Sequence, residues 1–393
     1  MRMLKKFGVA GIFMLLCYLV PLPGSAQYNN CHLRISILTC TPGSELYSTF
    51  GHSAIRVTDS VSQMDVVYNY GTFNFDEPDF YLKFVRGKLL YYLSTEDFES
   101  FKEDFETDQR GITEQVLNLT CPEKYNILMF LQTNLMAQNR FYKYDFLFDN
   151  CTTRLRDLLA KVSGESLKFK KVVKGKRTFR DLIYEYLDHN DKQWDKLGID
   201  LLLGSPTDAV MNTSQAMFIP DYLMKSLDSA TLDGKPLVRE THSLYYFKPP
   251  VVTKDYLTDP IFIFSLLLAL VVFLSYSKKG VARKFMVGFD RLLFFLTGLL
   301  GILLLFMWFG TDHAMCRDNF NLLWAWPTNI WAAFYAHSSK KPHKGYFRVY
   351  GYFGILLLLA WFFLPQHFNT ALIPIEAILI FRSLVFISPK NTL

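Results

Sequence analysis

The stretch FDNCTTRLRDLLAKV, residues 148–162, joins a cysteine in polar surroundings to the apolar spacing of a helix. Apolar residues recur at positions 155, 158, 159 and 162, which predicts an amphipathic helix that begins at Cys151. A core cysteine is usually flanked by other apolar residues. At a helix start, the partial positive charge of the first peptide groups favours the thiolate, which is the nucleophilic form. Cys151 is therefore a candidate nucleophile.

A nucleophilic cysteine needs a base, usually a histidine, within hydrogen-bond reach. His52 lies in GHSAIRV, residues 51–57, which is rich in residues that favour strands. A polar turn, TDSVSQ, separates it from MDVVYNY, residues 64–70, so two neighbouring antiparallel strands are predicted. We expect His52 to be the base, and a purely structural, hydrogen-bonded histidine is the alternative.

Two further elements are predicted in the same region. Residues 86–94, RGKLLYYLS, are expected to form another strand. A helix is expected from the capping residue Thr120, because Pro122 stands in its first turn and apolar residues follow at helical spacing.

The first 26 residues predict a secretory signal peptide. A basic beginning is followed by an apolar centre at residues 7–20, and the small residues Gly24 and Ala26 precede a cut before Gln27. An uncleaved anchor is the alternative, which the short apolar run disfavours. Residues 27–259 contain no spanning segment and are numerous enough to bury a core, so we expect one exported globular domain.

After Pro260 the composition becomes that of a membrane domain. The apolar runs lie at residues 261–276, 292–309, 321–336, 349–364 and 370–387. Residues 260–393 are therefore predicted to form an all-α bundle of about five transmembrane helices. The third run contains Pro327 and Asn329 and is the weakest of the five.

Basic residues in the loops predict the orientation. The loops after the first and third runs are rich in lysine and arginine, whereas TDHAMCRDNF and PQHFN carry one arginine between them. By the positive-inside rule, the large domain lies outside the inner membrane and the C-terminal PKNTL lies inside. The formal net charge of +6 is then mostly topological and does not indicate a nucleic-acid partner.

Three features of this region bear on function. Glu376 lies roughly 9 Å into the last run at 1.5 Å per residue, a depth at which an ionisable residue suggests a functional role. Arg382 is expected to snorkel to the cytoplasmic side. The outer loop at residues 311–320 is positioned to meet the exported domain from below.

Several long motifs, in order along the chain, carry a resemblance to a known family. They are TCTPGSELYSTFGHSAIRV from Thr39, VVYNYGTFNF from Val66, RFYKYDFLFDNCTTRLRDLL from Arg140, and then LLLGSPTD and AMFIPDYL. Together they resemble the periplasmic domain of the Bacteroides-type, Lnb-like lipoprotein N-acyltransferases, and the helical tail resembles that family's membrane region.

The order of the motifs also resembles circularly permuted papain-like enzymes, such as the lecithin:retinol acyltransferase group. In ordinary papain-like enzymes the cysteine precedes the histidine, whereas here His52 precedes Cys151. The fold that the resemblance implies is α+β: a circularly permuted papain-like (NlpC/LRAT-like) extracytoplasmic domain followed by the helical bundle.

The resemblance implies Cys151 as nucleophile and His52 as general base. The group that orients His52 should come from the strand at residues 64–70, in which alternation puts Tyr68 and Tyr70 on one face and Asn69 on the other. Where the retinol acyltransferase group has a second histidine this sequence has Tyr68, so Tyr68 is the predicted third catalytic residue.

Four residues near these motifs are predicted to bind substrate. Asn150 is expected to help stabilise an oxyanion beside the backbone N–H groups at the helix start, and a helix cap is its alternative role. The other three are Glu45, Tyr70 and Arg154.

The implied reaction moves an acyl chain in two steps. A membrane phospholipid donates the chain to Cys151 as a thioester, and the α-amine of the N-terminal diacylglyceryl-cysteine of a lipoprotein accepts it. Both substrates are lipids in one leaflet, so the site should lie near the membrane surface. We expect no cofactor, because the sequence has no zinc-ligand spacing, no glycine-rich phosphate loop and no paired-carboxylate signature.

Two rival functions stay open: a cell-wall cysteine amidase or peptidase, and a non-catalytic envelope binding module. One disulfide and one free thiol are expected among Cys31, Cys40 and Cys121, in a compartment where disulfides persist. The sequence leaves their pairing and the oligomeric state undetermined.

Overall fold

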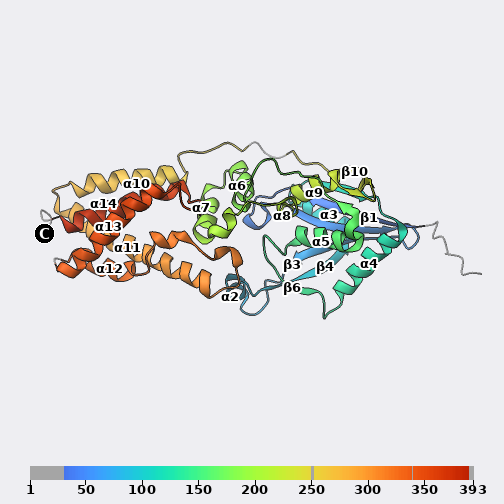
Figure 1. Cartoon of the computed structure of the whole chain (residues 1–393), viewed down its shortest axis with the longest axis horizontal. Helices are drawn as coiled ribbons and strands as arrows, with labels where there is room; N and C mark the ends of the chain where they lie inside the picture. The colour runs from blue at the N-terminus through green and yellow to red at the C-terminus, as the bar shows by residue number, and fades with distance from the viewer. Residues whose placement is uncertain (1–30, 249–251, 339, 389–393) are drawn as a thin grey trace, which may run out of the picture.

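The computed structural model describes residues 31–248, 252–338 and 340–388. The predicted signal peptide and the C-terminal PKNTL lie outside the described residues. The fold is α+β: the N-terminal part, the sheet domain (residues 31–248), contains the strands, and the C-terminal part, the helical bundle (residues 260–388), contains helices. Figure 1 shows the two parts at opposite ends of an elongated molecule.

A seven-stranded sheet forms the centre of the sheet domain. Its strands in chain order are β1 (Leu33–Cys40), β2 (His52–Asp59), β3 (Met64–Thr72), β4 (Leu90–Asp97), β5 (Ile112–Leu117), β6 (Phe141–Lys143) and β10 (Val238–Tyr245). Their spatial order is β10-β5-β1-β2-β3-β4-β6, with antiparallel neighbours throughout. The predicted hairpin of β2 and β3 is confirmed, and the strand expected at residues 86–94 begins later, at Leu90.

Both faces of this sheet are buried by helices. On one face, α5 (Cys151–Ser163) packs its leucines against β2 and β3, as its apolar spacing predicts. On the other face, α3 (Phe98–Thr107) places Phe101 and Phe105 against β3 and β4. The helix predicted from Thr120 is α4 (Cys121–Leu135), and Thr120 and Glu123 form a capping box at its start.

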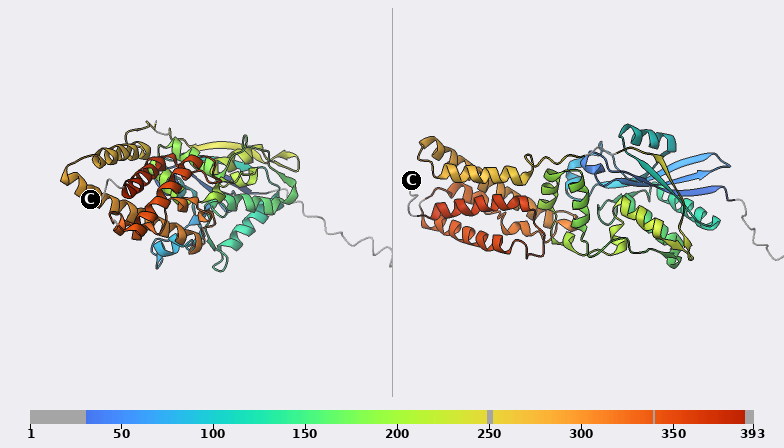
Figure 2. Two further views of the ribbon diagram at one scale, coloured as in Figure 1. Left: turned by 60° about the vertical axis from the view of Figure 1, so that its left-hand side comes forward. Right: turned by 90° about the horizontal axis from the view of Figure 1, so that it is seen from above.

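The remaining elements of the sheet domain complete its edges. The helices are α2 (Phe80–Val85), α6 (Phe179–His189), α7 (Gln193–Leu202), α8 (Thr213–Ala216) and α9 (Pro220–Ser229), and a second small sheet contains β7 (Leu167–Lys168), β8 (Thr231–Leu232) and β9 (Lys235–Pro236). In Figure 1 and in the right-hand view of Figure 2, α6 and α7 lie between the large sheet and the helical bundle.

A disulfide joins Cys31, which precedes β1, to Cys121 at the start of α4. Cys40 is buried and free. The prediction of one pair and one free thiol among these three cysteines is therefore confirmed.

The helical bundle contains α10 (Pro260–Ser275), α11 (Gly280–Phe309), α12 (Asn329–Tyr335), α13 (Lys341–Ala360) and α14 (Ile373–Ile387). Two helical segments, Gly280–Phe309 and Thr370–Ile387, are long and apolar enough to cross a membrane, and α10 is a shorter apolar helix. Five spans therefore stay a prediction.

The third apolar run is not one continuous helix, which corrects the expectation of a single helix over residues 321–336, and its crossing of the membrane stays a prediction. A short 3-10 turn, Phe320–Leu323, is separated from α12 by Pro327, which lacks a backbone N–H. Gly301 of α11 allows this irregular chain to approach closely, since a Cβ there would lie 2.1 Å from the Ala325 carbonyl oxygen. Non-helical backbone at membrane depth is tolerated where protein buries it in this way.

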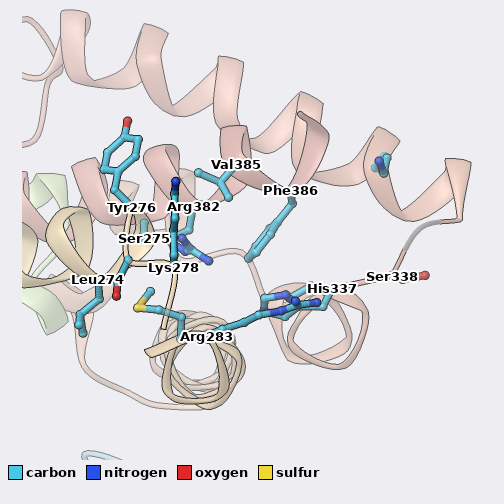
Figure 3. Close-up of a pocket in the computed structure, with 14 residues that line it drawn as sticks. Leu274, Ser275, Tyr276, Lys278, Arg283, His337, Ser338, Arg382, Val385 and Phe386 are labelled. Atoms are coloured by element: carbon cyan, nitrogen blue, oxygen red, sulfur yellow. Dashed lines mark hydrogen bonds between the residues drawn. The ribbon is translucent and has the colours of Figure 1, made fainter. Parts of the chain in front are cut away.

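Arg382 does not snorkel, which corrects the expectation from sequence. Its guanidinium is buried and donates two hydrogen bonds of 2.7 Å to the fully buried carboxylate of Asp290 on α11. Figure 3 shows Arg382 in a pocket with side chains from neighbouring helices. Glu376 is also buried, in the first turn of α14 against Gly354 of α13.

The loop after α11 docks onto the sheet domain, as its position in the sequence suggested. The Gly204 N–H donates to the Met315 carbonyl at 2.8 Å, and Asn319 Nδ2 donates to the Leu201 and Leu202 carbonyls at 2.8 and 3.0 Å. Backbone groups at the end of α7 are thus satisfied by the loop of the other domain.

A buried ion pair reinforces this junction. Arg180 of α6 and Asp200 of α7 lie 2.6 Å apart with almost no exposed side-chain surface. Asp200 also accepts hydrogen bonds from Tyr184 at 2.6 Å and from Asn369, which precedes α14, at 2.8 Å. Losing one partner of such a cluster would leave an uncompensated buried charge. The hydrogen bond from Asn369 ties this buried cluster of the sheet domain to the helical bundle.

The substitution Gly204→Ala tests this junction. A Cβ at Gly204 would lie 1.8 Å from the backbone oxygen of Arg317, so the loop has to move away. We expect a loss of about 1–3 kcal/mol in the free energy of unfolding, the usual cost of overpacking, measured by thermal or denaturant unfolding of the full-length protein. Gly198→Ala on α7 is the matched control, since its Cβ meets nothing within 4 Å. Equal stability of the two variants would contradict the docking.

Candidate active site

Cys151 is held at the start of α5 by the side chain of Asn150. Asn150 Oδ1 accepts hydrogen bonds from the N–H groups of Thr152 and Thr153 at 2.9 and 2.8 Å. Its Nδ2 donates to the carbonyls of Phe146 and Phe218, both at 2.8 Å. An amide has two acceptor sites and two donors, so all of its capacity is used. Asn150 is the helix cap, and its predicted role in binding substrate is wrong.

Two glycines bring the chain close to the nucleophile. Gly51 has a positive φ of 84°, and a Cβ there would lie 2.7 Å from the Cys40 carbonyl oxygen. It allows β2 to begin at His52 beside β1. Gly71 has a φ of 94°, and a Cβ on it would contact the Cys151 Cβ at 3.7 Å. The ends of β2 and β3 thus meet the start of α5.

His52 and Cys151 line the same cavity and lie within electrostatic reach of each other, so the structure brings the predicted nucleophile and base together. His52 Nε2 lies 3.0 Å from Asn69 Oδ1. Because Nε2 is engaged with Asn69, Nδ1 is the nitrogen available to the thiol. The ring of Phe105 stacks on the imidazole, with centroids 6.3 Å apart.

Asn69, not Tyr68, is the group behind His52, which corrects the predicted third residue. Ile55 pairs directly with Tyr68, so these two share the face that α5 covers. Alternation then puts His52 and Asn69 together on the opposite face. Tyr68 is buried in the apolar core, with 4% of its surface exposed.

Glu96 on β4 extends the chain of polar contacts. Its Oε1 accepts a hydrogen bond from Asn69 Nδ2. This bond fixes the orientation of the amide, so that Asn69 presents its oxygen to His52. Burial raises the pKa of Glu96, and the charge of nearby Asp104 raises it further. The contacts run in the order Glu96, Asn69, His52 and Cys151.

The electrostatics of the site favour the thiolate. Burial alone raises the pKa of Cys151, but the positive charge and hydrogen bond of His52 and the backbone N–H of Ser53 outweigh it, and the pKa falls to about 7. Burial lowers the pKa of His52, whereas the Cys151 thiolate and the hydrogen bond to Asn69 raise it, and the net shift is upward. The pair is therefore poised as thiolate and imidazolium near neutral pH.

A cavity of about 500 Å³ opens at Cys151 and His52. Its walls are mostly aromatic and aliphatic, with Phe50, Tyr70 and Phe73 from the sheet domain. The loop after α11 closes it with residues 313–316. The cavity thus belongs to both domains, and its lining suits an apolar ligand of the size that protein pockets usually take, roughly 300–1,000 Å³.

The other residues predicted to bind substrate differ in their position relative to the cavity. Tyr70 lines the cavity. Glu45 is exposed beside Leu46 and is not among the lining residues. Arg154 donates to the Asp149 carboxylate at 2.6 and 2.8 Å and lies over the Tyr142 ring, so its guanidinium is occupied within the domain. Glu45 and Arg154 are therefore not brought into the cavity by the structure, and their contact with substrate stays a prediction.

Sequence reasoning missed three contributors to the site. Asn69 was visible on its strand, and pairing β2 with β3 in register would have selected it. Glu96 and the buried Arg110, whose charge lies within electrostatic reach of Cys151, come from segments without a recognisable motif. In the described ranges, no cluster of three or more His, Cys, Asp or Glu residues is arranged to hold a metal ion.

The pH dependence of Cys151 alkylation tests the ion pair. The thiolate fraction falls as pH drops through the pKa, so the rate with iodoacetamide should have a midpoint at about 7. In His52→Ala the midpoint should move up toward the ordinary cysteine value, about 8.5. Cys316 is an internal control, because burial raises its pKa to about 11. A wild-type midpoint near 8.5, read by peptide mass spectrometry, would refute the pairing.

Comparisons with known proteins agree with this two-part architecture. The family model for the Lnb N-terminal periplasmic domain matches residues 23–188, and that for the Lnb transmembrane domain matches residues 252–391. Comparisons with curated proteins and with solved structures gave no match. The protein is thus a membrane protein with a periplasmic domain. With both parts of the family present in order, the chain belongs to the Lnb family, as an Lnb-like lipoprotein N-acyltransferase.

Proposed function

We propose that the protein moves an acyl chain from a membrane phospholipid, through a thioester on Cys151, to the α-amine of the N-terminal diacylglyceryl-cysteine of a lipoprotein. One observation carries the proposal. Cys151 and His52 both line an apolar cavity whose walls come from the two domains. A lipid acyl chain suits such walls better than a polar peptide stem does.

In the first step, the Cys151 thiolate attacks the ester carbonyl of the donor. The carbon–oxygen ester bond breaks, a carbon–sulfur bond forms, and the imidazolium of His52 gives its proton to the departing lysophospholipid oxygen. Asn150 occupies the N–H groups of Thr152 and Thr153. Among the first three N–H groups of α5, that of Cys151 is left to face the developing oxyanion.

In the second step, the amine of the acceptor attacks the thioester. Neutral His52 takes the proton of the amine, the carbon–sulfur bond breaks, and Cys151 leaves as a thiolate while the amide forms. Asn69 keeps the imidazole oriented in both steps through its 3.0 Å contact with Nε2. The apolar lining limits water, which would otherwise hydrolyse the thioester.

The same geometry supports a circularly permuted papain-like fold as part of the proposal. Papain-like enzymes use cysteine, histidine and asparagine, and here Asn69 accepts from the ring nitrogen of His52 that faces away from Cys151. The histidine comes from the start of β2 and the cysteine from the later helix α5, in the permuted order.

The proposal includes the placement of the chain in the membrane. Signal-peptide residues 1–26 direct residues 27–259 to the periplasm, and residues 260–393 form the inner-membrane domain with a cytoplasmic C-terminus, as the basic loops indicate. The cavity then lies between the periplasmic domain and the bundle, where it is within reach of lipids in the outer leaflet.

The substitution Cys151→Ser tests the nucleophile. The full-length protein is reconstituted in proteoliposomes of a phospholipid donor with a diacylated lipopeptide acceptor. Wild type should carry a hydroxylamine-labile acyl group on Cys151 and yield the triacylated product, both seen by mass spectrometry. The variant should lose at least about a thousandfold in rate, as nucleophile removal does in comparable enzymes.

Cys316→Ser is the control, because this free cysteine lines the same cavity. Unchanged acylation by the Cys151 variant would refute its role. A wild-type protein that releases peptides from cell-wall fragments and acylates nothing would favour an amidase instead.

The orienting role of Glu96 is tested by a pair of substitutions. Glu96→Ala removes the acceptor of the Asn69 amide, whereas Glu96→Gln keeps an oxygen there. We expect Glu96→Ala to lower kcat about tenfold, the order of a hydrogen bond to a charged group. Its Cys151 alkylation midpoint should rise as the ion pair weakens. An unchanged midpoint, or equal loss in both variants, would contradict the role.

A further inference from the structure

A second pocket, of about 420 Å³, lies at the end of the helical bundle remote from the sheet domain. We call it the basic pocket. Its lining comes from α10, α11, α13, α14 and the segment after α12, as Figure 3 shows for most of them. Five separate segments of the chain converge on one cavity, which therefore depends on the tertiary fold.

The floor of the basic pocket is an ordered ionic cluster. Asp290 is fully buried, accepts two hydrogen bonds from Arg382 and lies 2.9 Å from His337 Nε2. Arg382 also donates to the Ser275 hydroxyl at 2.6 Å. A guanidinium has five N–H donors, and these contacts use three. The floor thus neutralises one positive charge and retains free donor capacity.

The rim adds positive charge without neutralisation. Lys278, Arg283 and Lys344 line the pocket, and within the described ranges none has a side-chain hydrogen bond or an ion pair. Apart from Glu376, Asp290 is the only acidic residue in the helices α10 to α14. Glu376 lies in the first turn of α14, toward the sheet domain. The pocket therefore carries an excess of about three positive charges.

We propose that the basic pocket binds the phosphate group of a membrane lipid. Apolar side chains, Leu274, Met286 and Phe386, share the lining with the cations and the hydroxyl groups. An anionic headgroup with an apolar portion matches this division, and basic pockets between transmembrane helices commonly receive such headgroups. Because the pocket lies opposite the sheet domain, the lipid belongs to the other leaflet, and the site is independent of acyl transfer.

The test compares two double variants of the full-length protein. Arg283→Gln with Lys344→Gln removes two rim charges and leaves the floor intact. Lys284→Gln with Arg348→Gln removes two charges from the same helices, α11 and α13, at residues that do not line the pocket. Both should melt at the wild-type temperature without lipid, which shows that each variant is folded.

The measurement is native mass spectrometry of detergent-solubilised protein titrated with phosphatidylglycerol. The pocket variant should bind one lipid fewer, with an apparent Kd weakened at least about tenfold, since a basic residue near an anionic lipid surface contributes on the order of 1 kcal/mol. The control variant should stay within about twofold of wild type. Lipid that binds in the cavity at Cys151 should bind equally to wild type and to both double variants, so it does not affect the comparison.

A second titration uses inorganic phosphate. If it competes with phosphatidylglycerol at similar affinity and depends on the same two residues, the ligand is a soluble phosphate and the lipid assignment is overturned. Equal losses in both double variants would show diffuse charge attraction and overturn the site. The site would also be overturned if the wild-type protein bound no phosphatidylglycerol that depends on Arg283 and Lys344.

Discussion

The hydrogen bonds of the Asn150 amide set the position of the reactive thiol. Four bonds tie it to the start of α5, to Phe146 just before that helix and to the distant Phe218, so two segments far apart in sequence meet at one buried side chain. A helix cap is ordinarily worth about 1 kcal/mol. Here loss of the amide would also strand buried backbone groups, which costs more. The Cys151 thiol, its approach to His52 and the Cys151 N–H group all depend on where this helix begins.

The second constraint is the junction between the domains. The Arg180 and Asp200 pair is buried and satisfied by hydrogen bonds, and the loop after α11 supplies both docking contacts and part of the cavity wall. The proposed reaction needs its nucleophile at the membrane surface. The bundle contributes to that arrangement by forming part of the cavity wall.

Charge is used differently in the Cys151 site and in the basic pocket. At the Cys151 site, a buried imidazolium and thiolate stabilise each other, and Glu96 acts through Asn69. At the far end of the bundle, one carboxylate holds an arginine and a histidine, while the rim cations have no ion-pair partner among the residues that the structure describes. In the first arrangement, two opposite charges stabilise each other. In the second, an excess of positive charge remains, which a bound anion can balance.

Local patterns in the sequence were sufficient to predict many of the helices and strands of this protein. The helix spacing after Cys151, the strand character around His52 and the apolar runs after Pro260 are properties of short segments, and the structure has the corresponding elements. The proposed nucleophile, Cys151, and the proposed base, His52, followed from these segments. Pro327 suggested the break in the third run. The path of the chain around that break could not be predicted, because it depends on close packing against α11 at Gly301.

Tertiary structure alone decided three features of the site. These are the residue that orients His52, the hydrogen bonds that Asn150 and Arg154 make within the domain, and the residues that form the cavity wall. Each depends on strand register or on contacts between distant segments, such as His52 with Asn69 and residues 313–316 with the sheet domain. Periodicity reports which face of an element is buried. It does not report which side chains across that face come within hydrogen-bond distance, and that distance determines the chemistry.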